Sequence, residues 1–226
     1  LREIRPDREM LRLILRYGLP SGFQNSVIGF ANVVVQSNIN AFGELAMSGC
    51  GAYAKVEGFA FLPITSFTSA ITTFVGQNLG AEEFDRAKKG ARFGILCSLL
   101  IAEGIGVITY VFSPVFIGAF CDSQAAIAFG VDKAHICALF FCLLAATHCL
   151  SAVLRGAGRA MVPMVVMLSV WCVLRVSILW IAVPITQSIN TVNWVYPITW
   201  SISTVVLLIY YRKSDWLHSF QREKAE

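Results

Sequence analysis

The chain has 226 residues, of which 56% are hydrophobic and 14% charged, with a formal net charge of +4 and a mean hydropathy of +0.66. Soluble domains average about 45–50% apolar and about 25% charged residues, so this composition excludes an ordinary water-soluble domain. The apolar residues come in long blocks separated by short charged loops, which predicts a polytopic bundle of membrane helices and gives no indication of a nucleic-acid partner.

Residues 1–17 predict a short helix that lies on the cytoplasmic surface of the membrane. Asp7 is a candidate N-cap after Pro6. The residues that follow divide between an apolar and a basic side: Met10, Leu11, Ile14 and Leu15 against Arg8, Arg12 and Arg16. Such a helix binds anionic lipid. Because the chain begins at Leu1 with charged residues close behind, we expect no signal peptide and expect the chain to be part of a longer protein.

A first membrane span is predicted over residues 18–38, beginning near Pro20. It is unusually rich in amides: Gln24, Asn25, Asn32, Gln36 and Asn38. Lipid offers an amide side chain no hydrogen-bonding partner, so these residues should face protein or a cavity. The first four of them are therefore candidates for a substrate or ion pathway.

The second span, residues 49–77, carries two ionisable residues and a proline inside an apolar run. Lys55 and Glu57 are only two positions apart, so they cannot face each other on a helix and need separate partners. Pro63 removes a backbone hydrogen bond and should kink the helix. The kink is either static curvature or a hinge that exposes the Lys55–Glu57 turn alternately to the two sides.

Four more spans follow, over residues 90–112, 132–154, 161–183 and 194–211, and residues 212–226 form a tail. Six spans place both termini on the same side of the membrane. Fifteen of the 18 Lys and Arg residues lie on that side, near the termini and in two loops. By the positive-inside rule this side is the cytoplasm, so we expect a multi-pass protein of the inner (plasma) membrane with both termini cytoplasmic.

Further ionisable residues lie inside the later spans: Glu103, His148 and Arg175. Counted at about 1.5 Å per residue from the outer ends, Glu103 and Arg175 share the depth of Lys55 and Glu57, roughly 9–13 Å. Because a buried charge is costly without a partner, we predict a network in which Glu103 pairs with Arg175, as a structural lock or as part of the pathway. His148 is either a hydrogen-bonding residue between helices or a proton relay. Lys55 and Glu57 are candidate pathway residues.

No pattern typical of an enzyme is present. The sequence has no H-E-x-x-H, no G-x-S-x-G and no P-loop, and its seven cysteines show no C-x-x-C spacing. We therefore predict no catalytic residues, no metal site and no cofactor, and interpret the cysteines as small packing residues.

Three stretches together resemble the C-terminal half of bacterial multidrug and toxic compound extrusion (MATE) transporters. The run A-Y-A-K-V-E-G-F-A-F-L-P-I-T-S-F, followed by T-T-F-V-G-Q-N-L-G-A-E-E-F-D-R-A-K-K-G, resembles the eighth helix and the loop after it. Y-G-L-P-S-G-F-Q-N resembles the start of the seventh helix, and L-R-G-A-G-R-A-M-V-P the link between the tenth and eleventh. The resemblance covers nearly the whole chain.

The resemblance implies an all-α membrane protein whose six transmembrane helices form one lobe of a twelve-helix, two-lobe transporter, with an N-terminal six-helix lobe as the missing partner. It implies secondary active efflux of small cationic or amphiphilic compounds by Na⁺ or H⁺ antiport with alternating access. One departure is clear: many members carry an acidic residue in the seventh and tenth helices, whereas residues 18–38 have none and the fourth span has His148. Coupling then rests on Glu57 or on an acidic residue of the other lobe.

Two alternatives stay open at this point. A lipid-linked oligosaccharide flippase of the same superfamily would need a more cationic cavity for pyrophosphate, whereas the candidate charges sum to zero. A non-transporting membrane scaffold would have no need for four buried charges and a row of amides.

Overall fold

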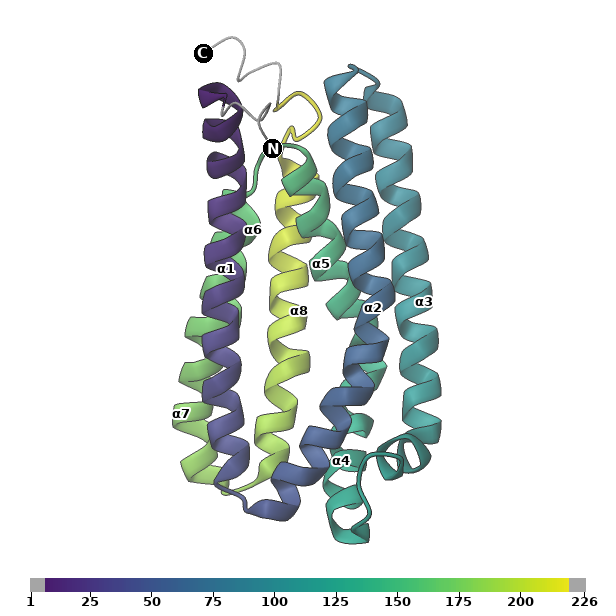
Figure 1. Cartoon of the computed structure of the whole chain (residues 1–226), viewed down its shortest axis with the longest axis vertical. Coiled ribbons are helices and arrows are strands. Elements are labelled where there is room, and N and C mark those ends of the chain that lie inside the picture. The colour runs from purple at the N-terminus through teal and green to yellow at the C-terminus, as the bar shows by residue number, and fades with distance from the viewer. Residues whose placement is uncertain (1–6, 220–226) are drawn as a thin grey trace, which may run out of the picture.

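The computed structural model describes residues 7–219, which form a bundle of long helices that run up and down along one axis (Figure 1). The helices, in chain order, are α1 (Arg8–Asn40), α2 (Glu44–Gly80), α3 (Phe84–Gly118), α4 (Gln124–Cys137), α5 (Phe141–Gly156), α6 (Met161–Met167), α7 (Arg175–Thr186) and α8 (Ile189–Lys213). A 3₁₀ turn, η1 (Ala138–Phe140), joins α4 to α5, and a π-helical segment, η2 (Leu168–Leu174), joins α6 to α7.

Five helical stretches are long and apolar enough to cross a membrane, and each has between 25 and 37 residues. They are α2, α3, the combined α4–η1–α5, the combined α6–η2–α7, and α8. Helix α1 has 33 residues and runs beside them, but its amide and charged residues make it less apolar than the other five (Figure 1). The predicted class, an all-helical membrane bundle with six long helical stretches, is confirmed.

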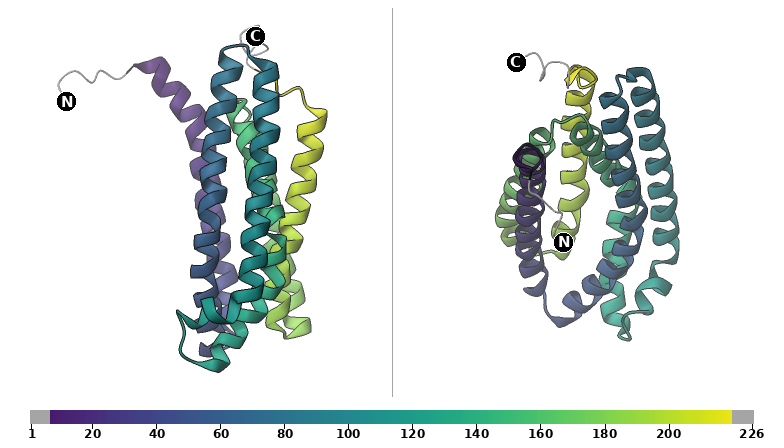
Figure 2. Two further views of the ribbon diagram at one scale, coloured as in Figure 1. Left: turned by 90° about the vertical axis from the view of Figure 1, so that its right-hand side faces the viewer. Right: turned by 45° about the horizontal axis from the view of Figure 1, so that its top comes forward.

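The bundle has two sides with a pair of helices between them. Figures 1 and 2 show α2 and α3 together on one side, and α1 with the α6–η2–α7 stretch on the other, while α5 and α8 lie between. The beginning of α1 and the end of α8 lie at the same end of the bundle, as an even number of crossings requires (Figure 1).

The helices extend beyond the predicted spans, and the prolines do not end them. Pro20, Pro114 and Pro184 all lie inside helices. In particular, the predicted boundary between a surface helix and a first span does not exist, because α1 is continuous from Arg8 to Asn40. A proline removes one backbone hydrogen bond and bends a helix, and neighbouring turns can carry the helix through it. The first part of α1 leans away from the bundle (Figure 2).

Close helix crossings depend on glycine. A Cβ on Gly49 of α2 would collide with the backbone carbonyl of Ala126 on α4, and a Cβ on Gly130 of α4 would lie 2.6 Å from the Gly49 carbonyl oxygen. Near the other end of α2, a Cβ on Gly156 would lie 2.6 Å from the carbonyl oxygen of Thr72. Small residues let membrane helices approach to backbone contact. These crossings hold α4 and α5 directly against α2.

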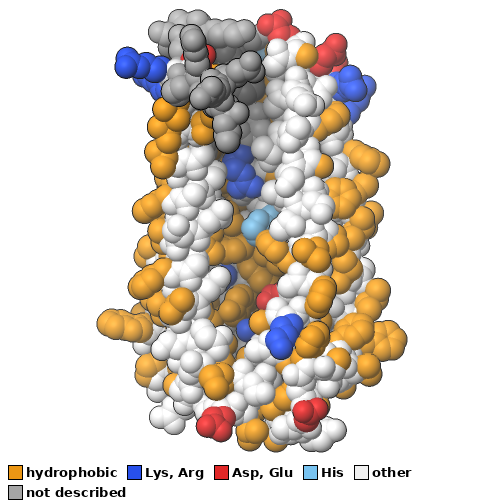
Figure 3. Space-filling model, in the orientation of Figure 1, with side chains coloured by type: hydrophobic (Ala, Val, Ile, Leu, Met, Phe, Trp, Pro, Cys, Tyr) orange, Lys and Arg blue, Asp and Glu red, His pale blue; other side chains and the backbone are white. Residues whose placement is uncertain are grey.

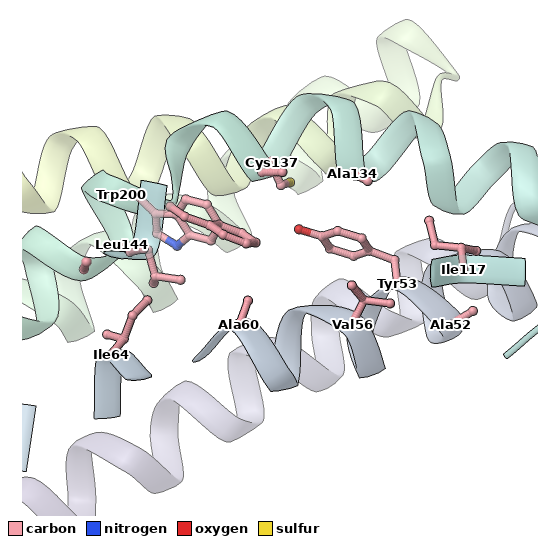
Figure 4. Close-up of a cluster of buried hydrophobic side chains, with 14 of the residues drawn as sticks. Ala52, Tyr53, Val56, Ala60, Ile64, Ile117, Ala134, Cys137, Leu144 and Trp200 are labelled. Carbon is pink, nitrogen blue, oxygen red and sulfur yellow. The ribbon is translucent and has the colours of Figure 1, made fainter. Parts of the chain in front are cut away.

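The first core cluster lies between α2, α3, α4, α5 and α8, with residues of α6 and η2 at its edge. Figure 4 shows its centre, where the Tyr53 side chain of α2 points its hydroxyl toward Cys137 of α4, with Trp200 of α8 further along. Tyr53 and Cys137 are fully buried, and all seven cysteines of the chain carry free thiols. All seven are buried or half-buried, which agrees with a packing role.

The segment after α8 is partly packed rather than a free tail. Trp216 is 4% exposed and stacks on Tyr211, with ring centroids 5.4 Å apart. The Ser219 hydroxyl donates to the carbonyl of Ala157 at 2.6 Å, and the Arg159 guanidinium donates to the Tyr210 hydroxyl at 2.9 Å. The last seven residues of the predicted tail, the first six of the predicted surface helix, and the basic residues among them (Arg2, Arg5, Arg222 and Lys224) lie outside the described residues.

Candidate functional site

A groove with a volume of about 590 Å³ lies between α1 and α2, with α5, η2 and α8 behind it. Figure 3 shows it as a hollow that runs along the bundle, with a basic side chain, a histidine and an acidic side chain exposed inside. Its lining residues are Ser21, Gln24, Asn25, Ile28, Asn32, Ala54, Glu57, Gly58, Phe61, Leu144, His148, Arg155, Met167, Trp171, Arg175, Tyr196 and Trp200. The groove is therefore polar at several points along an aromatic wall.

Helix α1 contributes one polar face. Ser21, Asn25, Ile28 and Asn32 recur at helical spacing, which brings them to the same side of α1. Gln24, the other amide that lines the groove, is buried and donates to the sulfur of Met167. Three of the four predicted α1 residues therefore line the groove. The fourth, Gln36, does not line it; its side chain is exposed and donates to the side chain of Asn40 at 2.8 Å.

Helix α2 turns Glu57 into the groove and Lys55 away from it. Ala54, Glu57, Gly58 and Phe61 share the lining face. Lys55 lies outside the groove, exposed, with its ammonium 5.2 Å from the centre of the Phe120 ring. The prediction that Lys55 lines the pathway is not met, because residues two apart on a helix point in different directions.

The predicted ion pair between Glu103 and Arg175 does not form. Arg175 is 2% exposed, lines the groove, and donates to the Thr199 hydroxyl at 2.7 Å. Glu103 lies on α3 and accepts a hydrogen bond of 3.1 Å from the backbone N–H of Cys142. Equal depth in the bundle does not bring two side chains together, because α3 packs on α2 and α5 and lies away from α7.

A buried lysine that the sequence analysis left aside takes part in the site. Lys133 of α4 is 4% exposed, and its ammonium lies 5.5 Å from the ring centre of Tyr53 and 4.7 Å from that of Tyr196. Tyr196 lines the groove, so Lys133 lies directly beside it. A lysine inside the apolar stretch at 124–137 was the signal that could have identified it.

Aromatic rings of the groove hold protein cations and one histidine. The Arg175 guanidinium lies 5.1 Å from the Trp171 ring centre and 4.7 Å from that of Tyr196. His148 packs edge-on between Phe61 and Trp171, with ring centroids 5.0 and 5.6 Å away. Buried Nε2 of His148 and Nε of Arg175 have no hydrogen-bond partner in the described part of the chain. His148 lines the groove, and among the described residues no hydrogen bond from this nitrogen joins helices.

Trp171, which lines the groove, lies within the π-helical segment η2. This segment inserts a wider turn between α6 and α7, and Arg175 begins the α-helix directly after it. Such segments are often found at functional positions in helices. Nothing in the apolar sequence Leu168–Leu174 predicts this change of helix type.

Arg155 is the second arginine of the groove. It lies one residue before the end of α5 and directly after the predicted span 132–154, so the sequence indicated only a basic residue at the start of a loop. It is half-buried, and no hydrogen bond or ion pair holds its guanidinium among the described residues. In the same range, no group of three or more His, Cys, Asp and Glu side chains is close enough to hold a metal ion.

Comparisons with known proteins identify relatives of this arrangement. The family model described as MatE matches residues 20–181. The chain is 27% identical over 213 residues to the Probable multidrug resistance protein YoeA of Bacillus subtilis, covering 93% of this chain and 46% of that protein. It is 30% identical over 165 residues to the Probable multidrug resistance protein NorM of Thermotoga maritima, covering 70% of this chain and 34% of that protein.

A solved structure shows the same fold. A crystal structure of MATE in the bent conformation superposes with a TM-score of 0.86 at 19% sequence identity, over 100% of this chain and 50% of that one. The chain thus spans about half the length of the relatives that it matches, and its helices have the arrangement of half of that transporter.

Proposed function

Because this chain belongs to the MatE family, we propose that it forms one half of a secondary transporter that exports cationic or amphiphilic compounds in exchange for Na⁺ or H⁺. One observation carries the proposal: Glu57 is the only acidic residue among the described residues that line the groove, and it lies within a membrane-spanning helix. A carboxylate in such a place changes its charge by binding a proton or a cation. This gives the groove a group that a coupling ion can act on.

The walls of the groove suit an amphiphilic compound. Phe61, Trp171 and Trp200 offer apolar and aromatic surface, and the α1 amides offer hydrogen bonds at one edge. Small-molecule sites are typically apolar clefts with a few polar groups that fix orientation. Binding of this kind accepts many apolar bodies, which is what export of varied toxic compounds requires. The proposal involves no catalytic step.

Alternating access in this proposal depends on α2. The helix carries Glu57 and Pro63 and changes direction along its length (Figure 1). After the proline, Thr65 and Ser66 both donate to the carbonyl of Leu62, at 2.8 and 3.0 Å. Hydroxyls that bond back to the helix backbone favour bending. We assign Pro63 the role of a hinge between two states of α2, one open to each side of the membrane.

A second six-helix lobe completes the transporter in this proposal. It would cover the groove, which is open on the face shown in Figure 3. The protein would lie in the plasma membrane with the end that carries Arg86, Lys88 and Lys89 in the cytoplasm, because loops rich in Lys and Arg stay inside. Membrane lipid surrounds the exposed apolar side chains of α3 and α7.

The function is tested with the complete gene product, including any sequence that adjoins these 226 residues. Cells without their own efflux pumps would express it, and export of ethidium and of uncharged and acidic fluorescent amphiphiles would be followed under imposed Na⁺ or pH gradients. We expect a gradient in one of the two ions to drive export of at least one compound. If neither gradient drives export of any of them, the proposed function is overturned.

The role of Glu57 is tested by Glu57→Gln, which keeps the shape of the side chain and removes its charge. We expect substrate binding to remain and gradient-driven export to be lost, because the group that binds the coupling ion is gone. Glu44→Gln is the matched control, since Glu44 is exposed at the beginning of the same helix and outside the groove. Unchanged gradient-driven export by Glu57→Gln would refute this role.

A further inference from the structure

We propose that the groove binds an acidic group of its substrate at the Arg155 guanidinium, so that this lobe favours amphiphiles with a carboxylate over those with an ammonium. The inference rests on the proposed export function and names the substrate class of the same groove. It follows from how the charges of the groove are distributed.

The groove is cationic. Arg155 and Arg175 line it, and Glu57 is the only acidic residue among the described lining residues. Lys133 adds a further positive charge next to Tyr53 and Tyr196. The sequence predicted four balanced charges, but Lys55 and Glu103 do not line the groove, and two other cations, Arg155 and Lys133, lie in or beside it. The field inside the groove therefore attracts anions.

Two of the aromatic rings that line the groove already carry cations of the protein itself. The faces of Trp171 and Tyr196 carry the Arg175 guanidinium, and Tyr196 also carries the Lys133 ammonium. An aromatic face attracts a cation through its ring quadrupole, but here the protein supplies that cation itself. At the Trp171 and Tyr196 rings a cationic substrate would have to displace a charge that the protein holds there.

The Arg155 guanidinium, by contrast, is not occupied by another group of the protein among the described residues. No described residue donates to, accepts from or pairs with its guanidinium, although it is half-buried. Arg159, four residues later, differs in that its guanidinium is hydrogen-bonded. It donates to the hydroxyl of Tyr210 at 2.9 Å and to the carbonyl of Asp215 at 3.3 Å. An arginine presents a planar pair of donors that matches a carboxylate in two hydrogen bonds. The free guanidinium of Arg155 is the natural partner for such a group.

The surroundings of Arg155 complete a site for an aromatic acid. His148 lies seven residues earlier on α5, two helical turns away, so both side chains face the groove on the same side of the helix. Phe61 and Trp171 flank His148 and offer aromatic surface to an apolar body. Arg175, with one unpartnered nitrogen, lies beyond Trp171 in the same groove. An acid would bind with its anion at Arg155 and its ring system along the aromatic wall.

The test uses three compounds with the same aromatic body: 1-pyrenebutyric acid, its carboxamide and 1-pyrenebutylamine. Their binding to the purified complete gene product is measured by pyrene fluorescence in detergent. We expect the acid to bind more tightly than the amide and the amine. In Arg155→Gln the affinity for the acid should fall by roughly 10- to 100-fold, the usual effect of removing a hydrogen bond to a charged group, while the affinity for the amide stays the same.

Two further variants distinguish a specific role of Arg155 from a general effect of positive charge. Arg155→Lys keeps the charge and should retain part of the preference for the acid, whereas Arg86→Gln removes an exposed arginine at the same end of the bundle and should change nothing. The inference is overturned if the amine binds tightest in the wild type, or if Arg155→Gln weakens acid and amide equally. Absence of gradient-driven export of every compound would count against the proposed function alone, because the binding preference is measured without a gradient.

Discussion

Replacement of Gly49 by alanine should loosen the crossing of α2 and α4 and destabilise the lobe. The added methyl group would collide with the carbonyl of Ala126, a backbone atom that cannot rotate away. Overpacking of this kind costs typically about 1–3 kcal/mol. The same crossing places Lys133 of α4 beside Tyr53 of α2, so we also expect the charge arrangement around Glu57 to shift.

Gly51→Ala is the control that separates the cost of the steric collision from the gain in helix propensity, because both contribute to the stability of Gly49→Ala. Gly51 lies on the same helix two residues later, and a Cβ there meets nothing within 4 Å. Both substitutions gain roughly 1 kcal/mol of helix propensity, so the difference between the two variants reports the collision. At about 2–4 °C per kcal/mol for a chain of this size, Gly49→Ala should unfold roughly 2–12 °C below Gly51→Ala.

The assay is thermal unfolding of the complete gene product in detergent, followed by intrinsic tryptophan fluorescence. A second pair on α3 repeats the comparison: a Cβ on Gly106 would collide with the carbonyl of Ala138, whereas one on Gly104 meets nothing within 4 Å. If Gly49→Ala and Gly51→Ala unfold at the same temperature, backbone contact at this crossing does not hold α4 against α2, and the reasoning is wrong.

Two further substitutions probe the packed segment after α8 and the bend of α2. Trp216→Ala should cost about 3–5 kcal/mol of stability, measured in the same unfolding assay, because it removes a side chain that is 4% exposed and stacked on Tyr211; Trp180→Ala, at an 82% exposed position, is the control and should change little. Pro63→Ala restores a backbone N–H worth up to about 3 kcal/mol to the helix and should slow export while leaving substrate affinity unchanged. An unaltered export rate in Pro63→Ala would remove the hinge role, and equal stability of the two tryptophan variants would contradict the packing argument.

The apolar blocks of the sequence were sufficient to predict a helical membrane bundle, because hydropathy over about 20 residues is a local property. The same local reasoning identified Gln24, Asn25, Asn32, Glu57 and His148, all of which line the groove. Lipid offers an ionisable or amide side chain no hydrogen-bonding partner, so such a side chain in an apolar run faces the interior of the bundle.

The tertiary structure decided which of the buried charges meet. Counting depth along the spans placed Glu103 level with Arg175, but depth says nothing about the direction in which a side chain points around the helix axis or about which helices are neighbours. Lys55 points away from the groove because of its direction around the axis of α2. Lys133 points toward the site from α4, and the sequence did not show which side of that helix faces inward.

The sequence by itself therefore determined the class of protein and most of the polar residues of the groove. Only the tertiary structure decided the sign of the groove's charge, because that sign depends on which few of the cations face inward. Arg155 shows this most clearly: in the sequence it is one basic residue of a loop, and in the bundle it is a half-buried arginine in a groove with one carboxylate among its described lining residues.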